Sequence, residues 1–463
     1  MAREDRTGRM ASLVSHRLEA WFGIERLTER HEIALLSAGL AFLAMVFLGP
    51  LMTGYDVIQT GDEGNGFRQG GYLAIFALTL YGARPLANGW KVLRVPLPVV
   101  VALAWCWISL SWAVSPAIAE RRLVLTSLVV WNSFILVKAA GYRLTVSILR
   151  LSLVMALIGN FLVVLILPET GIHMMKDAVI QTALAGDWRG FMTHKNFAGA
   201  ACALCILLFT FDTKYLSKAS RISVILASIF FLVKAQSKTS AGMVILAISV
   251  GFMFKIMDGK IRFFAIIGTA LLATLGWMYI SASRDVTTMD FLDPSSFTGR
   301  GLIWSSLLKF ARDNLMTGAG FESFWNIGDQ SPIYQYGKGY VTQITVGHNG
   351  YLDLLVTIGL PGMLLVTFAL ILWPLLRLLA ARGIAPERGA LICALVIFGM
   401  GHNVTESSMF ARDAIVGVFM LFAVAFAQDA SGSSRRRPAN QDSADVLHTI
   451  KRRHSNKAKP AAI

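Results

Sequence analysis

Apolar residues occur in long runs that recur along nearly the whole chain, and most runs are about 17 to 25 residues long, enough to cross a bilayer as an α-helix. Short polar connections separate most of these runs. The pattern predicts an all-α, polytopic membrane protein with about twelve transmembrane helices. The predicted spans are residues 33–53, 70–83, 95–114, 122–139, 145–167, 194–211, 221–236, 240–256, 262–282, 350–376, 387–404 and 411–428.

One polar connection, residues 283–347, is much longer than the others. Long loops in compact domains are usually functional, so we expect the chemistry of this chain there. The predicted organisation is an N-terminal tail of residues 1–32, a membrane domain of residues 33–428, and a basic, disordered tail of residues 429–463.

The composition agrees with this class of protein. Hydrophobic residues make up 55% of the chain and charged residues only 15%, and the mean hydropathy is +0.58. The first residues are charged and lack the apolar core and cleavage site of a signal peptide, so the first span is expected to be an uncleaved anchor.

All four cysteines fall in apolar runs. They are predicted to be small buried hydrophobes, including Cys202 and Cys205 with their C-x-x-C spacing.

Lysine and arginine are concentrated in every second connection, which is the pattern of cytoplasmic loops. The connections after the second, fourth, sixth, eighth and tenth spans are basic, and so is the C-terminal tail. Both termini are therefore predicted to be cytoplasmic. The formal net charge of +15 is then explained by orientation and by contact with anionic lipid, and nucleic acid is not an expected partner.

Several cations nevertheless fall on the predicted outer side, close to span ends. Ionisable groups at membrane depth usually face an aqueous cavity or a partner. Guanidinium groups bind phosphate through paired hydrogen bonds and stay charged, so a convergent set predicts a polyanionic ligand. For Arg121 and Arg122, the alternative to ligand binding is that each side chain extends to the lipid headgroups. The set comprises Arg121, Arg122, Arg189, Lys195, Lys238, Arg300 and Arg412.

Two features of the long connection suggest specific roles. Residues 302–314 carry apolar side chains at helical spacing and predict an amphipathic helix along the outer interface. Arg300 would lie at the N-terminus of this helix, where the helix dipole also favours an anion. His348 ends the connection and is a candidate general base, because a neutral imidazole accepts a hydroxyl proton near neutral pH.

Other roles for the histidines remain open at this point. His194 and His402 compete with His348 for the role of base. His348 would instead be structural if it caps the following span or hydrogen bonds to Asn349. The outer histidines lack the spacing of a metal site, and neither a metal nor a cofactor is predicted.

Five short motifs occur in a particular order along the chain, and Glu406 and Ser407 follow them after two spans. The motifs are R-G-F-x-x-x-x-N (189–196), S-K-T-S (237–240), T-G-R-x-x-x-W (298–304), T-G-x-G (317–320) and H-N-G-Y-L-x-x-L-x-x-x-G-L-P-G (348–362). With these motifs, residues from about 35 to 428 resemble the O-antigen ligase and Wzy-type polymerase family of integral membrane glycosyltransferases. The last motif is most similar to exopolysaccharide polymerases of the ExoQ kind. Lys238 departs from the family pattern, in which arginine is frequent at this position.

The resemblance implies a metal-independent, inverting transfer of a glycan from an undecaprenyl-diphosphate carrier to an acceptor hydroxyl. This reaction would take place at the periplasmic face of the bacterial inner membrane. By the resemblance, His348 would be the base, and Arg300 and Arg189 would neutralise the leaving diphosphate. The substrate-binding residues would be Lys195, Asn196, Lys238, Asn349, Glu406 and Arg412.

The preferred hypothesis is polymerisation of exopolysaccharide or O-antigen repeat units, and an O-antigen ligase that transfers glycan to lipid A–core is the alternative. Outside the family, a polysaccharide transporter or flippase would predict charges deep within spans and a repeat of hydropathy, and the sequence shows neither. The implied partners are the lipid-linked oligosaccharide and the bilayer. Chain-length regulators and export proteins are further candidate partners.

Overall fold

The computed structural model describes residues 29–52, 65–174, 184–259, 300–381 and 383–433, together with a few isolated residues next to these ranges. The predicted all-α fold is confirmed for this part of the chain, which contains helices and two isolated bridges but no strand. The predicted N-terminal and C-terminal tails lie largely outside the described residues. The predicted span 262–282 and the motif residues Thr298 and Gly299 also lie largely or wholly outside them.

Every predicted span that the described residues cover coincides with a helix. Four helical segments are long and apolar enough to cross a membrane: α2, α7, α11 and the continuous segment from α15 to α16. The total of about twelve spans stays a prediction. The helices are α2 (Arg30–Leu48), α4 (Gly66–Ala83), α6 (Leu97–Ile108), α7 (Pro116–Ile166), α9 (Lys195–Thr210), α10 (Lys218–Ala235), α11 (Lys238–Ile256), α13 (Arg300–Asp313), α14 (Ile333–Tyr336), α15 (Gly350–Thr367), α16 (Trp373–Ala380), α17 (Pro386–His402) and α18 (Ile415–Ser433), with short helices α5 (Pro85–Asn88) and α8 (Pro168–Gly171).

Helix α7 joins two predicted spans without a loop between them. Its 51 residues cover both 122–139 and 145–167, and the chain changes direction at Gly141, where φ is 75°. Glycine adopts this left-handed conformation at little cost because it has no Cβ atom. The short polar connection predicted between these spans is therefore a kink.

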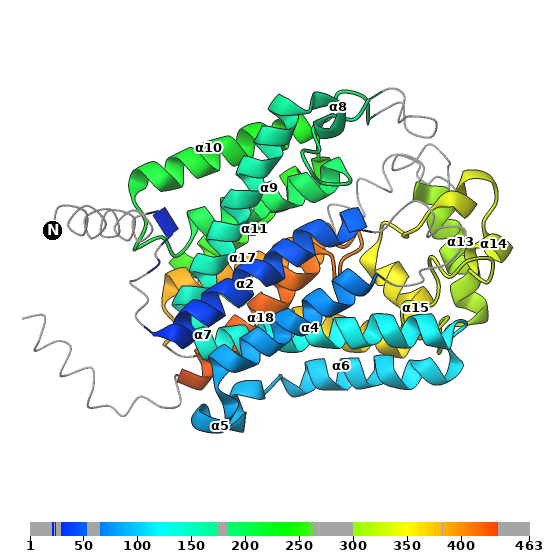
Figure 1. Ribbon diagram of the computed structural model, residues 1–463, viewed down its shortest axis with the longest axis horizontal. Helices are drawn as coiled ribbons and strands as arrows, with labels where there is room; N and C mark the ends of the chain where they lie inside the picture. The colour runs from blue at the N-terminus through cyan, green and yellow to red at the C-terminus, as the bar shows by residue number, and fades with distance from the viewer. Residues whose placement is uncertain are drawn as a thin grey trace, which may run out of the picture.

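The long helices run side by side along the longest axis of the molecule (Figure 1). Helices α17 and α18 supply much of the core, since nearly all of their side chains are buried. Outer helices instead expose large apolar side chains, such as Leu165 at 73% and Leu226 at 60%. An exposed apolar surface of this kind is costly in water but suits lipid, so the fold is that of a multi-pass membrane protein.

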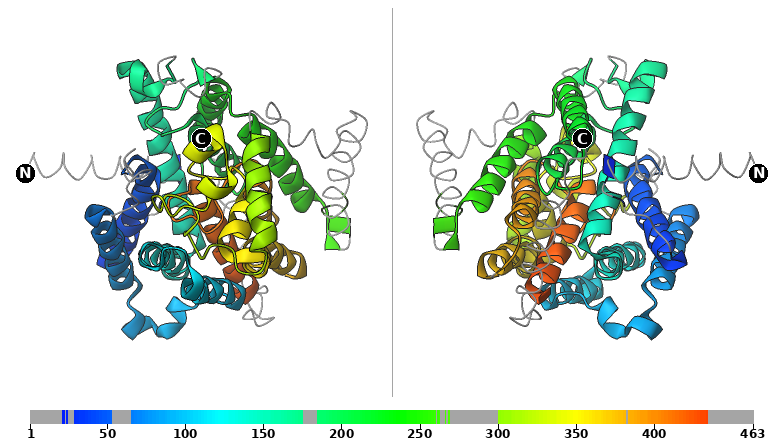
Figure 2. Two further views of the ribbon diagram at one scale, coloured as in Figure 1. Left: turned by 90° about the vertical axis from the view of Figure 1, so that its right-hand side faces the viewer. Right: turned by 90° about the vertical axis from the view of Figure 1, so that its left-hand side faces the viewer.

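Residues in or next to the odd-numbered predicted connections meet at one end of the helical bundle. Arg68 lies in the first connection and forms an ion pair with Asp413, which lies near the start of the last predicted span, just after the eleventh connection. Arg122, the first residue after the third connection, donates to the carbonyl oxygen of Trp325 in the ninth connection at 2.9 Å. Helices α13 and α14 lie at this end, on the right in Figure 1 and facing the viewer in the left view of Figure 2.

Residues at span ends next to the even-numbered connections meet in the same way at the opposite end. Lys255, just before the eighth connection, and Glu387, just after the tenth, form an ion pair of 2.7 Å. Arg388 and Lys138 both contact the Asp429 carboxylate, at 3.1 and 3.6 Å. A chain whose spans alternate in direction produces this separation of connections. Which end faces the periplasm stays a prediction.

Candidate active site

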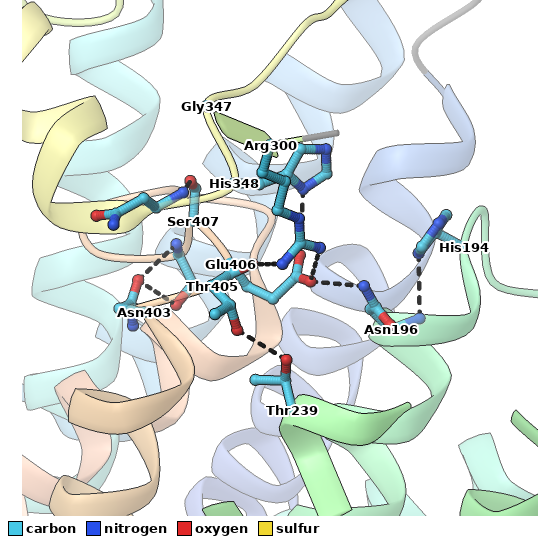
Figure 3. A network of polar contacts seen from close by, with 12 residues as sticks. His194, Asn196, Thr239, Arg300, Gly347, His348, Asn403, Thr405, Glu406 and Ser407 are labelled. Atoms are coloured by element: carbon cyan, nitrogen blue, oxygen red, sulfur yellow. Dashed lines mark hydrogen bonds and ion pairs between the residues drawn. The ribbon is translucent and has the colours of Figure 1, made fainter. Parts of the chain in front are cut away.

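The Glu406 carboxylate is the centre of a polar cluster, in which it contacts side chains from three other parts of the sequence (Figure 3). Its Oε1 atom accepts from Arg300 Nη2 at 2.8 Å and from Asn196 Nδ2 at 2.5 Å. Its Oε2 atom lies 3.5 Å from His348 Nδ1. The Glu406 side chain is only 11% exposed, and those of Arg300 and His348 are 15% and 25% exposed. We call these four residues the Glu406 cluster.

Arg300 is the first residue of α13, as the sequence predicts. The apolar face of α13 packs against α15 through Ile303, Leu307 and Phe310, which are all buried. The guanidinium group therefore points from the helix start toward the loop between α17 and α18, where Nη1 also donates to the carbonyl oxygen of Thr405. Two of the five guanidinium N–H donors are engaged by these contacts, so others are left to bind a ligand anion.

A bend in α15 fixes the position of α13 against it. Gly359, inside α15, has a φ of 70°, and the N–H of Leu360 donates to the carbonyl oxygen of Leu315 at 2.8 Å. The N–H of Ala319 donates in turn to the carbonyl oxygen of Val356 at 2.8 Å. The loop that follows α13 is thus hydrogen bonded to α15, and this sets the position of Arg300 relative to the start of α15.

His348 lies in a tight turn that its neighbours hold in place. Its φ of 49° is in the left-handed region, which a side chain with a Cβ atom adopts only when its surroundings impose it. The N–H of the preceding Gly347 lies 3.1 Å from both carboxylate oxygens of the partly buried Asp353. The Gly347 carbonyl oxygen accepts from Trp304 Nε1 at 3.0 Å.

Asn349 contributes to the local fold at the start of α15. Its Oδ1 atom accepts from the N–H groups of Tyr351 and Leu352 at 3.1 and 3.0 Å, which is an N-cap. Its own N–H donates to Ser407 Oγ at 3.0 Å. Because Ser407 follows Glu406, this bond joins the His348 turn to the Glu406 loop.

Glu406 is ionised at neutral pH. Burial raises its pKa, but the hydrogen bond from His348 and the positive charge of Arg300 outweigh burial and bring the pKa to about 2. A carboxylate at Nδ1 favours the tautomer in which that nitrogen carries the proton. His348 Nε2 is then left with a free lone pair, which is the form that a general base requires.

Residues 222–367 match the family model of O-antigen ligase. The predicted resemblance is confirmed. The matched segment contains Lys238, Arg300 and His348, while Asn196 and Glu406 lie outside it on either side. No curated protein matches the chain.

The two competing histidines are poorly placed to act as the base. His194 lies just before α9, and its Nδ1 accepts from the Asn196 N–H at 3.2 Å. Burial lowers the pKa of His194 to about 3. His402 is 4% exposed at the end of α17, and neither of its ring nitrogens has a hydrogen-bond partner among the described residues. His348 is the histidine that contacts the Glu406 carboxylate, on the oxygen opposite the one that Arg300 binds.

The remaining predicted residues make other contacts. Lys195 Nζ pairs with Asp187 Oδ2 at 2.5 Å, and Arg412 Nη1 pairs with Glu322 Oε2 at 2.7 Å. Arg189 Nε donates to the carbonyl oxygen of Thr170 at 2.8 Å. None of these three contacts involves a residue of the Glu406 cluster.

Lys238 is exposed at the first position of α11. Its neighbour Thr239 is the residue that reaches the Glu406 loop, because Thr239 Oγ1 lies 2.7 Å from Thr405 Oγ1. The structure thus connects the S-K-T-S motif to the cluster through the threonine.

Sequence reasoning missed several residues that shape this end of the molecule. Asp353 lies within an apolar run and gives no local signal of its contact with Gly347. Arg68 does carry a signal, because it is a cation at the outer end of the predicted span 70–83, as unusual there as Arg121.

Among the described residues, no group of three or more His, Cys, Asp or Glu side chains is arranged to hold a metal ion.

Proposed function

We propose that this protein transfers a glycan from an undecaprenyl-diphosphate carrier to an acceptor hydroxyl without a metal ion. The observation that supports this most is that Arg300 and His348 both contact the Glu406 carboxylate, at 2.8 and 3.5 Å. A charged donor for phosphate oxygens and a histidine base are thus held together in a protein of the O-antigen ligase family. Their shared end of the bundle is assigned to the periplasmic face of the bacterial inner membrane.

The proposed reaction is a single inverting displacement. The acceptor oxygen attacks the anomeric carbon of the donor sugar, and its proton passes to Nε2 of His348. The bond between the anomeric carbon and the diphosphate oxygen breaks, and the diphosphate leaves with the electron pair. Arg300 stabilises the charge that grows on this leaving group, with Arg189 as a second contact, and such preorganised charges are effective where water is excluded.

Glu406 has two roles in this proposal. It keeps the proton on Nδ1 of His348, and it becomes the counter-ion of the imidazolium once Nε2 has accepted the acceptor proton. It also fixes the rotamer of Arg300. Asn196 and Thr239 hold the Glu406 loop by hydrogen bonds and are positioning residues.

Polymerisation of exopolysaccharide or O-antigen repeat units is the form of the reaction that we favour, because of the similarity of the 348–362 segment to exopolysaccharide polymerases. The description of the matched family favours the second candidate, an O-antigen ligase that transfers glycan to lipid A–core. The two candidates share the donor and the proposed site, and they differ in the acceptor.

A deletion strain separates the two candidates. Surface and lipid-linked glycans are extracted and sized on a gel, and the deletion is complemented with the wild-type chain or with His348→Ala. If long chains vanish while single repeat units remain, the protein is a polymerase. If full-length chains persist on the carrier but do not reach their acceptor, it is a ligase. Full complementation by His348→Ala at wild-type expression would overturn the proposed site.

A further inference from the structure

Arg122 is a buried arginine whose guanidinium group binds backbone carbonyl oxygens. It lies near the start of α7 and is 5% exposed. Its Nη1 atom donates to the carbonyl oxygens of Glu322 and Trp325 at 2.6 and 2.9 Å, and its Nη2 atom donates to that of Asn326 at 2.8 Å. These acceptors all belong to the loop of residues 314–332, which joins α13 to α14. Arg122 thus fastens this loop to α7.

The part of the loop that Arg122 binds has a strained backbone. The φ angles of Glu322 and Asn326 are 50° and 56°, in the left-handed region that disfavours a side chain with a Cβ atom. Such a conformation persists only where its surroundings impose it. The earlier part of the loop has a contact of its own, from the Val114 N–H to the Ala319 carbonyl oxygen at 2.9 Å. Loss of the Arg122 hydrogen bonds is therefore expected to change the loop locally, around the strained residues.

Trp325 connects this part of the loop to the start of α15. Its carbonyl oxygen accepts from Arg122, and its indole Nε1 atom donates to Asp353 Oδ1 at 2.8 Å. The Asp353 carboxylate also accepts from the Gly347 N–H at 3.1 Å. Gly347 directly precedes His348 (Figure 3). Each step from Arg122 to the His348 turn is therefore a hydrogen bond or a covalent connection.

We propose that Arg122 is a positioning residue for His348. It acts through the Trp325 side chain and the Asp353 carboxylate, and it touches no reacting atom. This inference rests on the proposed function, in which His348 is the base. A base must lie within hydrogen-bond reach of the acceptor hydroxyl, and a displacement of about 1 Å lowers a rate by up to about a hundredfold. An arginine that binds the diphosphate directly would instead affect substrate affinity.

The test measures the single-turnover rate of transfer per folded molecule, and the affinity for undecaprenyl diphosphate by titration. Arg122→Lys keeps the charge, but one ammonium group cannot bind all three carbonyl oxygens in the geometry of a guanidinium fork. The rate should fall by about tenfold with unchanged affinity, because the base is displaced while the diphosphate contacts remain. Trp325→Phe keeps an aromatic ring but loses the Nε1 donor, and it should show a loss of similar size.

Arg150→Lys is the matched control for the loss of a buried arginine. Arg150 also belongs to α7, is 4% exposed and donates to the carbonyl oxygens of Leu208, Phe211 and Asp212 at 2.8 to 3.2 Å. These acceptors lie at the end of α9, next to the sixth predicted connection and at the opposite end of the bundle. The control should lose stability as Arg122→Lys does, yet keep the wild-type rate per folded molecule.

A double variant tests the route from Arg122 to the base. If Arg122 acts through Asp353, Arg122→Lys/Asp353→Ala should lose about tenfold in rate, no more than Asp353→Ala alone, because the connection is already broken. Independent effects would multiply to about a hundredfold. A multiplied loss, an unchanged rate in Arg122→Lys, or an equal loss in Arg150→Lys would overturn the inference.

Two further outcomes separate this inference from the proposed function. Weakened affinity for undecaprenyl diphosphate in Arg122→Lys, with an unchanged chemical step, would overturn the inference and make Arg122 a diphosphate ligand. It would leave His348 as the base. Transfer by His348→Ala at the wild-type rate would contradict the proposed base itself, and the positioning role with it.

Discussion

Arg300 and Glu406 are 106 residues apart in the sequence, and their side chains form an ion pair of 2.8 Å. The pair joins the first residue of α13 to the loop between α17 and α18. His348 contacts the other oxygen of the same carboxylate. The arginine and the histidine are therefore positioned by one group, and a change in that group should affect both.

Arg300→Lys is expected to lower the rate of glycan transfer by about one hundredfold, although the charge is kept. A lysine supplies a single ammonium group and cannot bind Glu406, the Thr405 carbonyl oxygen and a phosphate oxygen in the fixed fork of a guanidinium. A loss of this kind corresponds to about 3 kcal/mol. The measurement is transfer by purified protein with a lipid-linked donor. Lys309→Ala, an exposed change on the same helix, is the control, and equal rates for Arg300→Lys and wild type would contradict the assignment.

His348→Ala is expected to reduce the rate of the chemical step by about two to four decades, because a general base is lost. Donor affinity should change little, since the diphosphate contacts are assigned to arginine. The rate is measured in a single turnover, and affinity by titration with undecaprenyl diphosphate. A weakened affinity together with an unchanged rate would show that His348 binds substrate and does not remove the proton.

Glu406→Gln is expected to change how stability depends on pH. The pKa of Glu406 is lowered from about 4.5 to about 2 in the folded protein, so its ionised form stabilises the fold. This contribution, about 3 kcal/mol, is fully present above pH 5 and is lost as the pH falls toward 2. Melting temperatures of wild type and Glu406→Gln are compared across this window. The wild-type advantage should shrink on acidification, and two parallel curves would be evidence against an ionised, stabilising Glu406.

Asp353→Ala is expected to lower the transfer rate by about tenfold through the His348 turn. It leaves the Gly347 N–H and Trp325 Nε1 without their partly buried acceptor, which costs about 1 to 3 kcal/mol. Asp353→Asn keeps one oxygen acceptor and should recover most of the rate. A purely structural role would lower the amount of folded protein but leave the rate per folded molecule unchanged for both variants.

Gly359→Ala is expected to destabilise the protein by about 1 to 3 kcal/mol. The φ of 70° disfavours a side chain, and a Cβ atom would lie 2.3 Å from the carbonyl oxygen of Met316. Gly242→Ala in α11 is the matched control, because a Cβ atom there meets open space, and it should be neutral or slightly stabilising. If thermal melting shows similar losses for both variants, the bend in α15 does not hold the α13 loop.

The helical spans could be predicted from the sequence because each depends on local composition. A run of apolar residues that is buried in lipid or in a helical core must satisfy its own backbone hydrogen bonds, and a helix does so within the run. The same reasoning located α13, from the apolar spacing after Arg300. It missed the kink at Gly141, because the neighbouring polar residues gave the same signal as a loop.

The candidate site was predicted in part. Arg300, His348, Asn196 and Glu406 were singled out from the sequence, and the structure brings them together. Other cations chosen by the same reasoning have different partners, such as Arg412 with Glu322. A lysine or arginine in a connection predicted to be poor in cations is unusual at its position. Its presence there carries no information about which distant side chain it contacts in the folded protein.

By itself the sequence determined the helical character of this protein, the alternation of its basic connections and the identity of the cations that fall outside this alternation. Each of these follows from local length, hydropathy or charge. Only the tertiary structure decided that Glu406 joins Arg300 to His348, that Asp353 holds the His348 turn, and that Arg68 and Arg121 share a pocket with Arg412. These contacts depend on how distant helix ends are packed together, and the packing is the sum of many interactions along the whole length of the bundle.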